Sequence, residues 1–113
     1  MRRAAKTDTT HAAIRDHLRS VGWSVFDASP LGKSFPDLVC ARLGFTALVE
    51  CKSRNDAYRS LSEGQREFIN SWQGAIVVAN SPEQAERELT ARLLGFRLEQ
   101  LRSEEAELDG YTP

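Results

Sequence analysis

The segment that most restricts the fold of this chain is residues 35–53, which read FPDLVCARLGFTALVECKS. Two apolar runs flank residues 43–45, and so short a connection joins antiparallel strands through a tight turn. The sequence therefore predicts a β-hairpin. Three charged residues nevertheless interrupt the apolar runs, namely Asp37, Glu50 and Lys52.

The turn decides whether these three charges share a face of the sheet. Glu50 and Lys52 do, because side chains alternate between the two faces of a strand. Directly opposed residues of a hairpin share a face of the sheet. Asp37 therefore joins Glu50 and Lys52 if the residue numbers of each opposed pair add up to an odd number. A two-residue loop at Gly44 and Phe45 meets this condition, with Gly44 supplying the positive φ of a type II′ turn and Asp37 opposite Lys52. A four-residue loop keeps the same face, whereas an unbulged three-residue loop does not.

Two carboxylates on one partly desolvated face repel each other, and a divalent cation relieves that repulsion. Mg²⁺ suits such a site because it binds through one or two carboxylates and keeps water and phosphate oxygens. A lysine beside it can position a water and offset charge on a phosphorane-like transition state. The three charges therefore predict phosphodiester hydrolysis. The ordinary alternatives are a turn role for Asp37 and an exposed ion pair between Glu50 and Lys52.

The rest of the chain alternates helical and extended patterns. The first helix, over residues 7–22, has an apolar stripe of Ile14, His17, Leu18 and Val21, on which His17 is expected to be a core histidine. The third helix is expected to end at Gly95. The predicted elements are a helix over 7–22, a strand over 23–28, a loop over 29–34, strands over 36–42 and 46–53, a helix over 62–74, a strand over 75–80 and a helix over 81–95.

This order, α-β-β-β-α-β-α, predicts an α/β fold with a mixed sheet covered by helices on both faces. The length of 113 residues predicts one domain, with a core over about 8–95 and an acidic, partly flexible extension over 96–113. No apolar run approaches the ~18–20 residues of a membrane helix. Residues 1–66 carry 11 Lys and Arg against 7 Asp and Glu, whereas residues 67–113 carry 4 against 9. A polyanion would therefore meet the first part of the chain.

The hairpin motif resembles the PD-(D/E)xK nuclease superfamily: Pro36-Asp37, then twelve residues, then Glu50-Cys51-Lys52. The closer resemblance is to its small VRR-NUC-like branch, which includes stand-alone phage and bacterial proteins, and it covers roughly residues 8–94. The segments GKSFPDL, before the acid, and LSEGQREFINSWQG followed by AIVVANSPEQA support it.

This resemblance implies a restriction-endonuclease-like fold and Mg²⁺ as cofactor, with Mn²⁺ as a substitute. It implies that Asp37, Glu50 and the backbone carbonyl of Cys51 bind the metal, that Lys52 is the catalytic lysine and that Gln65 lies near the site. The family often has an acid in the first helix where this chain has His11, so the first-helix ligand stays open.

Several of these residues have an ordinary alternative. Gln65 could instead complete a capping box with Ser62. His11 is expected more often as an unremarkable residue of the first helical turn. A set of loop residues could contact nucleic-acid phosphates or simply be solvated: Lys33, Ser34, Arg54 and Arg59.

The expected function is Mg²⁺-dependent hydrolysis of DNA, by an endonuclease that nicks or selects branched or flapped structures. So small a domain offers little surface for reading base sequence. The alternative is a catalytically silent nucleic-acid-binding or assembly module on the same fold. DNA is the expected partner, a homodimer is left open, and the cytoplasm of a bacterial or phage-infected cell is the expected location.

Overall fold

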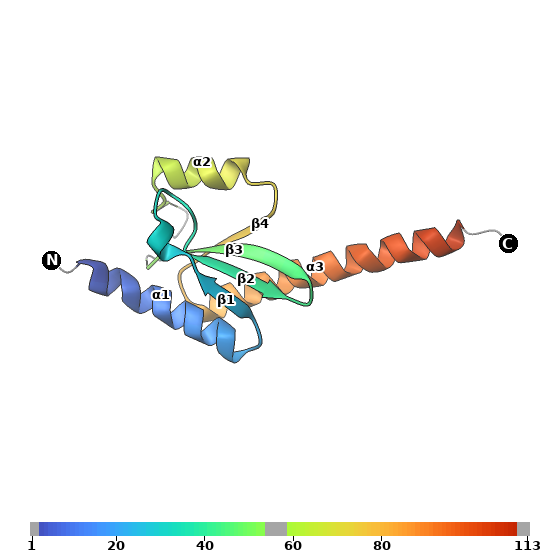
Figure 1. The fold of residues 1–113 in the computed structure, drawn as a ribbon, viewed down its shortest axis with the longest axis horizontal. Coiled ribbons are helices and arrows are strands. Elements are labelled where there is room, and N and C mark those ends of the chain that lie inside the picture. Colours follow the sequence, from blue (N-terminus) through green and yellow to red (C-terminus); the bar gives the residue numbers. More distant parts are fainter. Residues whose placement is uncertain (1–2, 54–58, 111–113) are drawn as a thin grey trace.

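A computed structural model describes residues 3–53 and 59–110 of this chain (Figure 1). The elements follow the predicted order, with one added 3-10 turn, η1, in the loop after the first strand. Their bounds are α1 Arg3–Ser20, β1 Ser24–Asp27, η1 Ser29–Leu31, β2 Leu38–Arg42, β3 Phe45–Cys51, α2 Glu63–Ser71, β4 Ala75–Ala79 and α3 Pro82–Asp109.

The predicted mixed sheet is confirmed, with strand order β1-β2-β3-β4. Its first two pairs are antiparallel, and β4 runs parallel to β3. A parallel strand needs a crossover connection, and α2 lies in the one that joins β3 to β4. The sheet therefore brings the end of β3 next to the end of β4, where Cys51 pairs with Ala79.

The hairpin turn lies one residue earlier than predicted. Arg42 pairs with Phe45, so the loop consists of Leu43 and Gly44, which both have positive φ (52° and 81°) as in a type I′ turn. The predicted loop at Gly44 and Phe45 is wrong because Phe45 is a core residue whose ring contacts those of Trp23 and Phe96. The residue numbers of each opposed pair, such as Arg42 and Phe45, still add up to an odd number. The prediction that Asp37 lies on the same face as Glu50 and Lys52 is therefore confirmed.

One face of the sheet holds the hydrophobic core, between the strands and the helices α1 and α3 (Figure 1). Ile14 and Leu18 of α1 and Leu89 of α3 are fully buried there. The strand residues on this face are Leu38, Cys40, Ala47, Val49, Cys51, Val77 and Ala79. Both cysteines are free thiols in this layer. Burial raises the pKa of Cys40 to about 12, and it also raises the pKa of Cys51.

His17 does not belong to this core, which corrects the expectation from the first-helix stripe. Its side chain is half-buried, and its Nε2 atom lies 2.7 Å from Oε1 of Glu86 on α3. The contact lies between the two helices that cover the sheet. A polar residue on the stripe is accommodated because α1 packs on α3 as well as on the strands.

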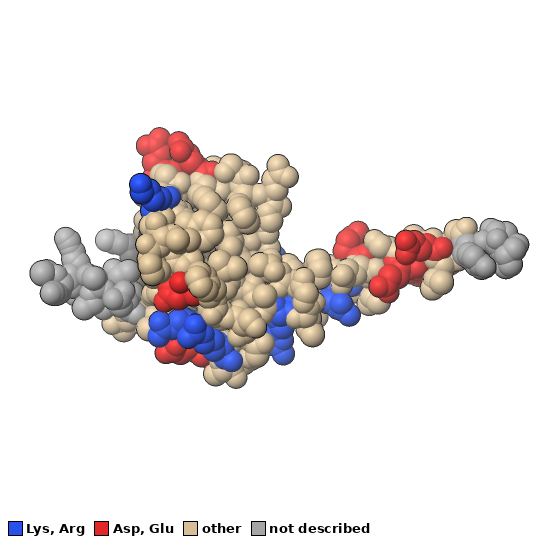
Figure 2. All heavy atoms as spheres, viewed as in Figure 1, with Lys and Arg blue, Asp and Glu red and all other residues tan. Residues whose placement is uncertain are grey.

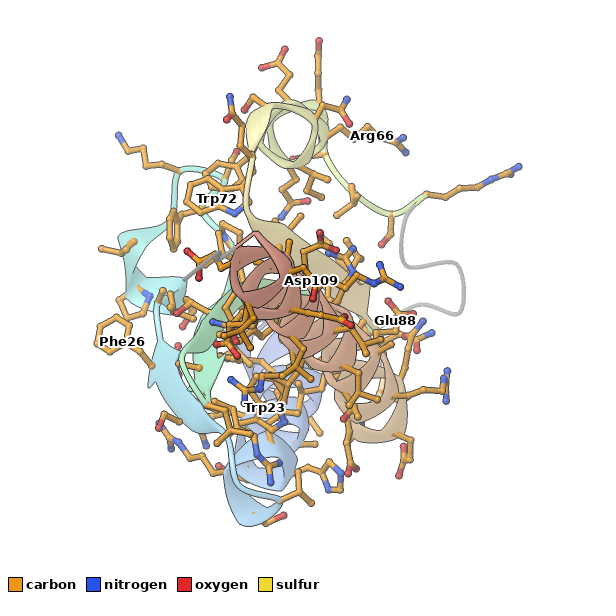
Figure 3. The ribbon with its side chains drawn as sticks, turned by 90° about the vertical axis from the view of Figure 1, so that its right-hand side faces the viewer. Trp23, Phe26, Arg66, Trp72, Glu88 and Asp109 are labelled. Atoms are coloured by element: carbon orange, nitrogen blue, oxygen red, sulfur yellow. The ribbon has the colours of Figure 1, made fainter. Side chains whose placement is uncertain are left out.

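The opposite face of the sheet is covered only in part. Leu48 is buried on this face, whereas Phe26 at the β1 edge is exposed and points away from the other elements (Figure 3). Phe68 of α2 stacks on Trp72 and meets the ring of Phe35 edge-on. Helices were predicted to cover both faces of the sheet. They cover the core face, whereas on the opposite face only the part near α2 and the loop before β2 is covered.

The third helix is much longer than predicted. It passes through Gly95 and continues to Asp109, so the expected end at Gly95 is wrong, and the acidic segment expected to be frayed is helical as far as Asp109. This helix projects from the body and gives the protein overall dimensions of 69 × 30 × 24 Å (Figure 1). In the described residues, none of the helices has the length and apolar character needed to cross a membrane.

Candidate functional site

The end of the hairpin brings two carboxyl groups together on the partly covered face. Glu50 lies near the end of β3, and continuing the β2–β3 register by one step places Asp37 level with it. Asp37 precedes β2, and its Oδ2 atom accepts a hydrogen bond of 2.8 Å from the backbone amide of Cys51. That bond fixes the Asp37 carboxylate across the end of β3.

Glu50 is a buried acid, with 4% of its surface exposed. Burial raises its pKa to about 8, and the negative charge of Asp37 acts in the same direction, while Lys52 opposes them. Burial also raises the pKa of Asp37, although the hydrogen bond from Cys51 favours its ionised form. Two carboxyl groups in this state resist full ionisation near neutral pH, and a cation that binds both would favour it.

Lys52 lies on the same side of the sheet as Glu50, two residues further along the chain. Its Nζ atom is 3.8 Å from Oε2 of Glu50, and its side chain is mostly buried. The backbone amide of Lys52 donates to the carbonyl of Ala79, so the chain is held against β4 at this point. The ammonium group is therefore positioned at the carboxyl pair from a fixed backbone.

Gln65 performs both of the roles that the sequence left as alternatives. It completes a capping box at the start of α2, in which the Ser62 amide donates to Oε1 of Gln65 and the Ser62 hydroxyl accepts from the Gln65 amide. Its Nε2 atom donates to Oε2 of Glu50 at 3.0 Å. The side-chain amide has an acceptor and a donor group, so one residue starts the helix and ties it to the acid.

His11 is not an ordinary first-turn residue, because α1 begins eight residues earlier than His11, at Arg3. The His11 side chain is buried, and its Nε2 atom lies 3.2 Å from Oδ1 of Asp27 without making a hydrogen bond to it. Asp27 also lies 3.4 Å from Nη1 of Arg15. His11 is close enough for its charge to lower the pKa of Asp37.

Asp27 is a site residue that the sequence reasoning missed. It lies at the end of β1 on the same parity as Val25, which faces the core side of the sheet. The sequence did carry a signal for Asp27, namely a charged residue at a strand position whose side chain faces the core. His11 and Asp27 thus form a second polar group beside Asp37, reached from the α1 side of the sheet.

Three of the four residues proposed to contact phosphates lie in the described part of the chain. Lys33 and Ser34 form a turn in which both residues have positive φ (55° and 68°), a conformation that non-glycine residues adopt rarely. Ser34 packs against Gly64 so closely that a side chain at position 64 would collide with it. Arg59 is exposed, and its carbonyl accepts from Arg66. Arg54 lies outside the described residues.

The donor set suits a hard divalent cation. Asp37 and Glu50 offer carboxylate oxygens, the ligands that Mg²⁺ prefers, and the buried Nε2 atom of His11 without a hydrogen-bond partner shows that polar groups near the pair are not fully satisfied by the protein. In the part of the chain that the structure describes, no three His, Cys, Asp or Glu side chains come together as a metal cluster. The predicted set needs only two carboxylates and a backbone carbonyl, so the residues present fit the ion.

Comparisons with models of protein families, with curated proteins and with solved structures found no match to this chain. A function must therefore be inferred from the residues and contacts of the site.

Proposed function

We propose that this protein is a Mg²⁺-dependent nuclease with a restriction-endonuclease-like fold, which hydrolyses phosphodiester bonds in DNA. The observation that carries the proposal is the carboxyl pair of half-buried Asp37 and buried Glu50, in which Glu50 accepts a hydrogen bond from Gln65 and lies 3.8 Å from the ammonium group of Lys52. A sheet that needed only packing would place apolar residues here, because burying mutually repelling acids costs stability.

Each residue has a defined part in this proposal. Asp37 and Glu50 hold the ion, with the Cys51 carbonyl as a further ligand. When bound, Mg²⁺ supplies a Lewis acid at a phosphate oxygen. Lys52 places a positive charge where negative charge grows on the phosphate during hydrolysis. Gln65 fixes the Glu50 carboxylate by its hydrogen bond, so Gln65 is a positioning residue.

The small size of the body favours selection of DNA structure over base sequence. Specific readout generally buries ~1,000 Å² or more of protein surface, which is large for a chain of this length. We therefore infer that the enzyme selects branched or flapped DNA, or that it nicks DNA. The exposed face beside Lys33 and Ser34 is the proposed approach for the phosphate backbone.

The test is a cleavage assay on linear, flapped and four-way DNA and on a single-stranded RNA, with Mg²⁺, Mn²⁺, Ca²⁺ or a chelator. Cleavage of structured DNA with Mg²⁺ or Mn²⁺ is expected, with binding but little turnover in Ca²⁺, whose looser coordination positions water poorly. Cleavage that persists in chelator contradicts the proposal. Binding of DNA with no cleavage under any ion would instead indicate the silent binding module.

A matched pair of variants separates the site from contaminating nuclease. Glu50→Gln should abolish the metal-dependent cleavage, because it removes a charged ligand while keeping the side-chain shape. Glu63→Gln makes the same change on an exposed residue in the first turn of α2 and should leave cleavage unchanged. Equal activity in both variants would show that the carboxyl pair is not the site.

A further inference from the structure

The helix α3 carries two apolar stripes on different sides. The first stripe faces the body and consists of Ala85, Leu89, Leu93 and Phe96. Beyond Phe96 the positions that continue this stripe are polar and exposed: Gln100, Ser103 and Glu107. The contact of the helix with its own body therefore ends near Phe96, where the ring packs on Phe45.

The second stripe begins where the first one ends. Four leucines on it are between 54% and 75% exposed, namely Leu94, Leu98, Leu101 and Leu108. Together with Glu105, these leucines follow one another at alternating steps of four and three residues. This spacing is the heptad repeat of a coiled-coil seam. At about 100° per residue the seam lies roughly 150° around the helix from the body-facing stripe. Single exposed leucines are common, but a row at this spacing on a projecting helix indicates a partner helix.

We propose that this seam pairs α3 with the α3 helix of a second copy of the chain, in antiparallel orientation, with Leu98 opposite the partner's Leu101. The distribution of charge along α3 favours an antiparallel second copy of this helix as the partner. From Arg92 onward, the arginines of α3 lie nearer the body and the acidic side chains, apart from Glu99, lie toward the projecting end (Figure 2). Antiparallel pairing places the basic part of each helix against the acidic end of the other.

The positions that flank the seam distinguish the two orientations. In the antiparallel register, Arg97 lies beside the partner's Glu104, and the two-fold axis repeats this favourable pair. A parallel, in-register pair would place Arg97 beside the partner's Arg102 and Glu104 beside the partner's Asp109, both of which are like-charge contacts. It would also bring the two Glu105 side chains together in the seam.

The body leaves room for this arrangement. Arg87, Thr90 and Ala91 lie on the seam side of the first half of α3 and are exposed, so the end of the partner's helix can lie along them. The overlap of residues 91–108 spans about 27 Å of helix. This is a small interface, so we expect dissociation in the range of ~1–100 μM and not an obligate dimer.

Sedimentation equilibrium of the full chain over about 1–300 μM tests the proposal. A concentration-dependent monomer–dimer equilibrium is expected. Leu98→Glu combined with Leu101→Glu should weaken it by ~100-fold or more, since two seam leucines per chain lose their burial. Ser103→Glu combined with Ala106→Glu adds the same charge away from the seam and should leave it within about threefold. A monomer at all concentrations, or equal loss in the control, overturns the proposal.

Charge reversal tests the orientation, and thermal melting of each variant confirms that it is folded. Arg97→Glu and Glu104→Arg should each weaken the dimer several-fold, and combining them should restore it. In a parallel pair, Arg97→Glu would relieve repulsion and strengthen the dimer. That strengthening would overturn the antiparallel register. The proposal is independent of whether the carboxyl pair cleaves DNA, because none of these residues belongs to that site.

Discussion

Glu50 is held in surroundings that favour its protonated form, and this has a measurable effect on stability. Its pKa is about 8 in the folded protein and has an ordinary value of 4.5 when the chain is unfolded. Between these values the folded state binds more protons than the unfolded state, so the free energy of unfolding decreases as pH rises through this window. The raised pKa of Asp37 acts in the same direction. Asp27, whose pKa is lowered, acts only at more acidic pH.

We therefore expect the melting temperature of the protein in chelator to fall between about pH 5 and pH 8. Glu50→Gln should flatten this dependence, because the amide does not titrate. Glu63→Gln is the control and should keep the slope of the parent. The same slope in Glu50→Gln and in the parent would show that another group causes the effect.

Asp37 can be tested with metal, because its hydrogen bond survives a change to asparagine. The amide oxygen of Asp37→Asn can still accept from Cys51, while the repulsion with Glu50 is removed. The variant should melt at or above the parent in chelator. Mg²⁺ at about ten times its Kd should stabilise the parent by ~1.4 kcal/mol and the variant by much less. A parent that ignores Mg²⁺, with a variant that is less stable in chelator, would contradict the metal site.

Lys52 tests the catalytic part of the proposal separately from binding. Lys52→Ala should keep DNA affinity near that of the parent but lower turnover by ~10²-fold or more, the scale of losing one transition-state-stabilising group. Lys52→Arg should rescue poorly, because the guanidinium is broader and stays protonated. Single-turnover cleavage and binding in Ca²⁺ give the two quantities. Parental turnover in Lys52→Ala would make Lys52 a structural residue.

At the scale of elements, a glycine in α2 and a glycine in α3 differ in the space that an added side chain would find. Gly64 lies in the first turn of α2 against Ser34, and an added Cβ would collide with the Ser34 hydroxyl. Gly95 lies inside α3 with no neighbouring atom where its Cβ would be. An added methyl group would thus meet the Ser34 hydroxyl at the first glycine, whereas the second glycine only weakens a helix.

Gly95→Ala should therefore stabilise the protein by about 0.5–1 kcal/mol, the usual difference between the two residues inside a helix. Gly64→Ala should stabilise the protein less than Gly95→Ala, because the Ser34 hydroxyl must rotate away from the added methyl group. Urea unfolding with unchanged m-values measures both effects. A loss of stability in Gly95→Ala would mean that α3 is not continuous at that position.

The elements also show how far the sequence could predict this structure. The shared face of Glu50 and Lys52 was predictable, because alternation along a strand depends only on local sequence, and Asp37 joins them because the predicted and observed loops both have two residues. The position of the turn was not, because Phe45 enters the strand through contacts with Trp23 and Phe96, which are distant in sequence. The same holds for His11 and Asp27, which meet only when α1 packs on β1.

At the scale of the whole molecule, the shape follows from one helix that leaves its body. The apolar spacing that predicts residues 81–95 as a helix reflects contact with the sheet, and it changes sides after Phe96. The expected end at Gly95 treated the glycine as a helix stop signal close to the end of the first stripe, but the helix continues through it. The continuation was visible as a second heptad stripe, which is a signal for contact with another helix.

The reaction of the two buried thiols with a thiol reagent can report local opening of the sheet. Cys40 and Cys51 are shielded on the core side of the sheet and remain protonated at neutral pH, and the thiolate is the form that reacts with disulfide reagents. A cysteine introduced on the exposed arm of α3 should therefore be labelled selectively without removing the native ones. The slow reaction of Cys51, followed in Cys40→Ala, would measure how often the end of β3 opens beside Glu50. Mg²⁺ should slow that reaction if it closes the two acids together, and an unchanged rate would show that the strand end opens independently of the ion.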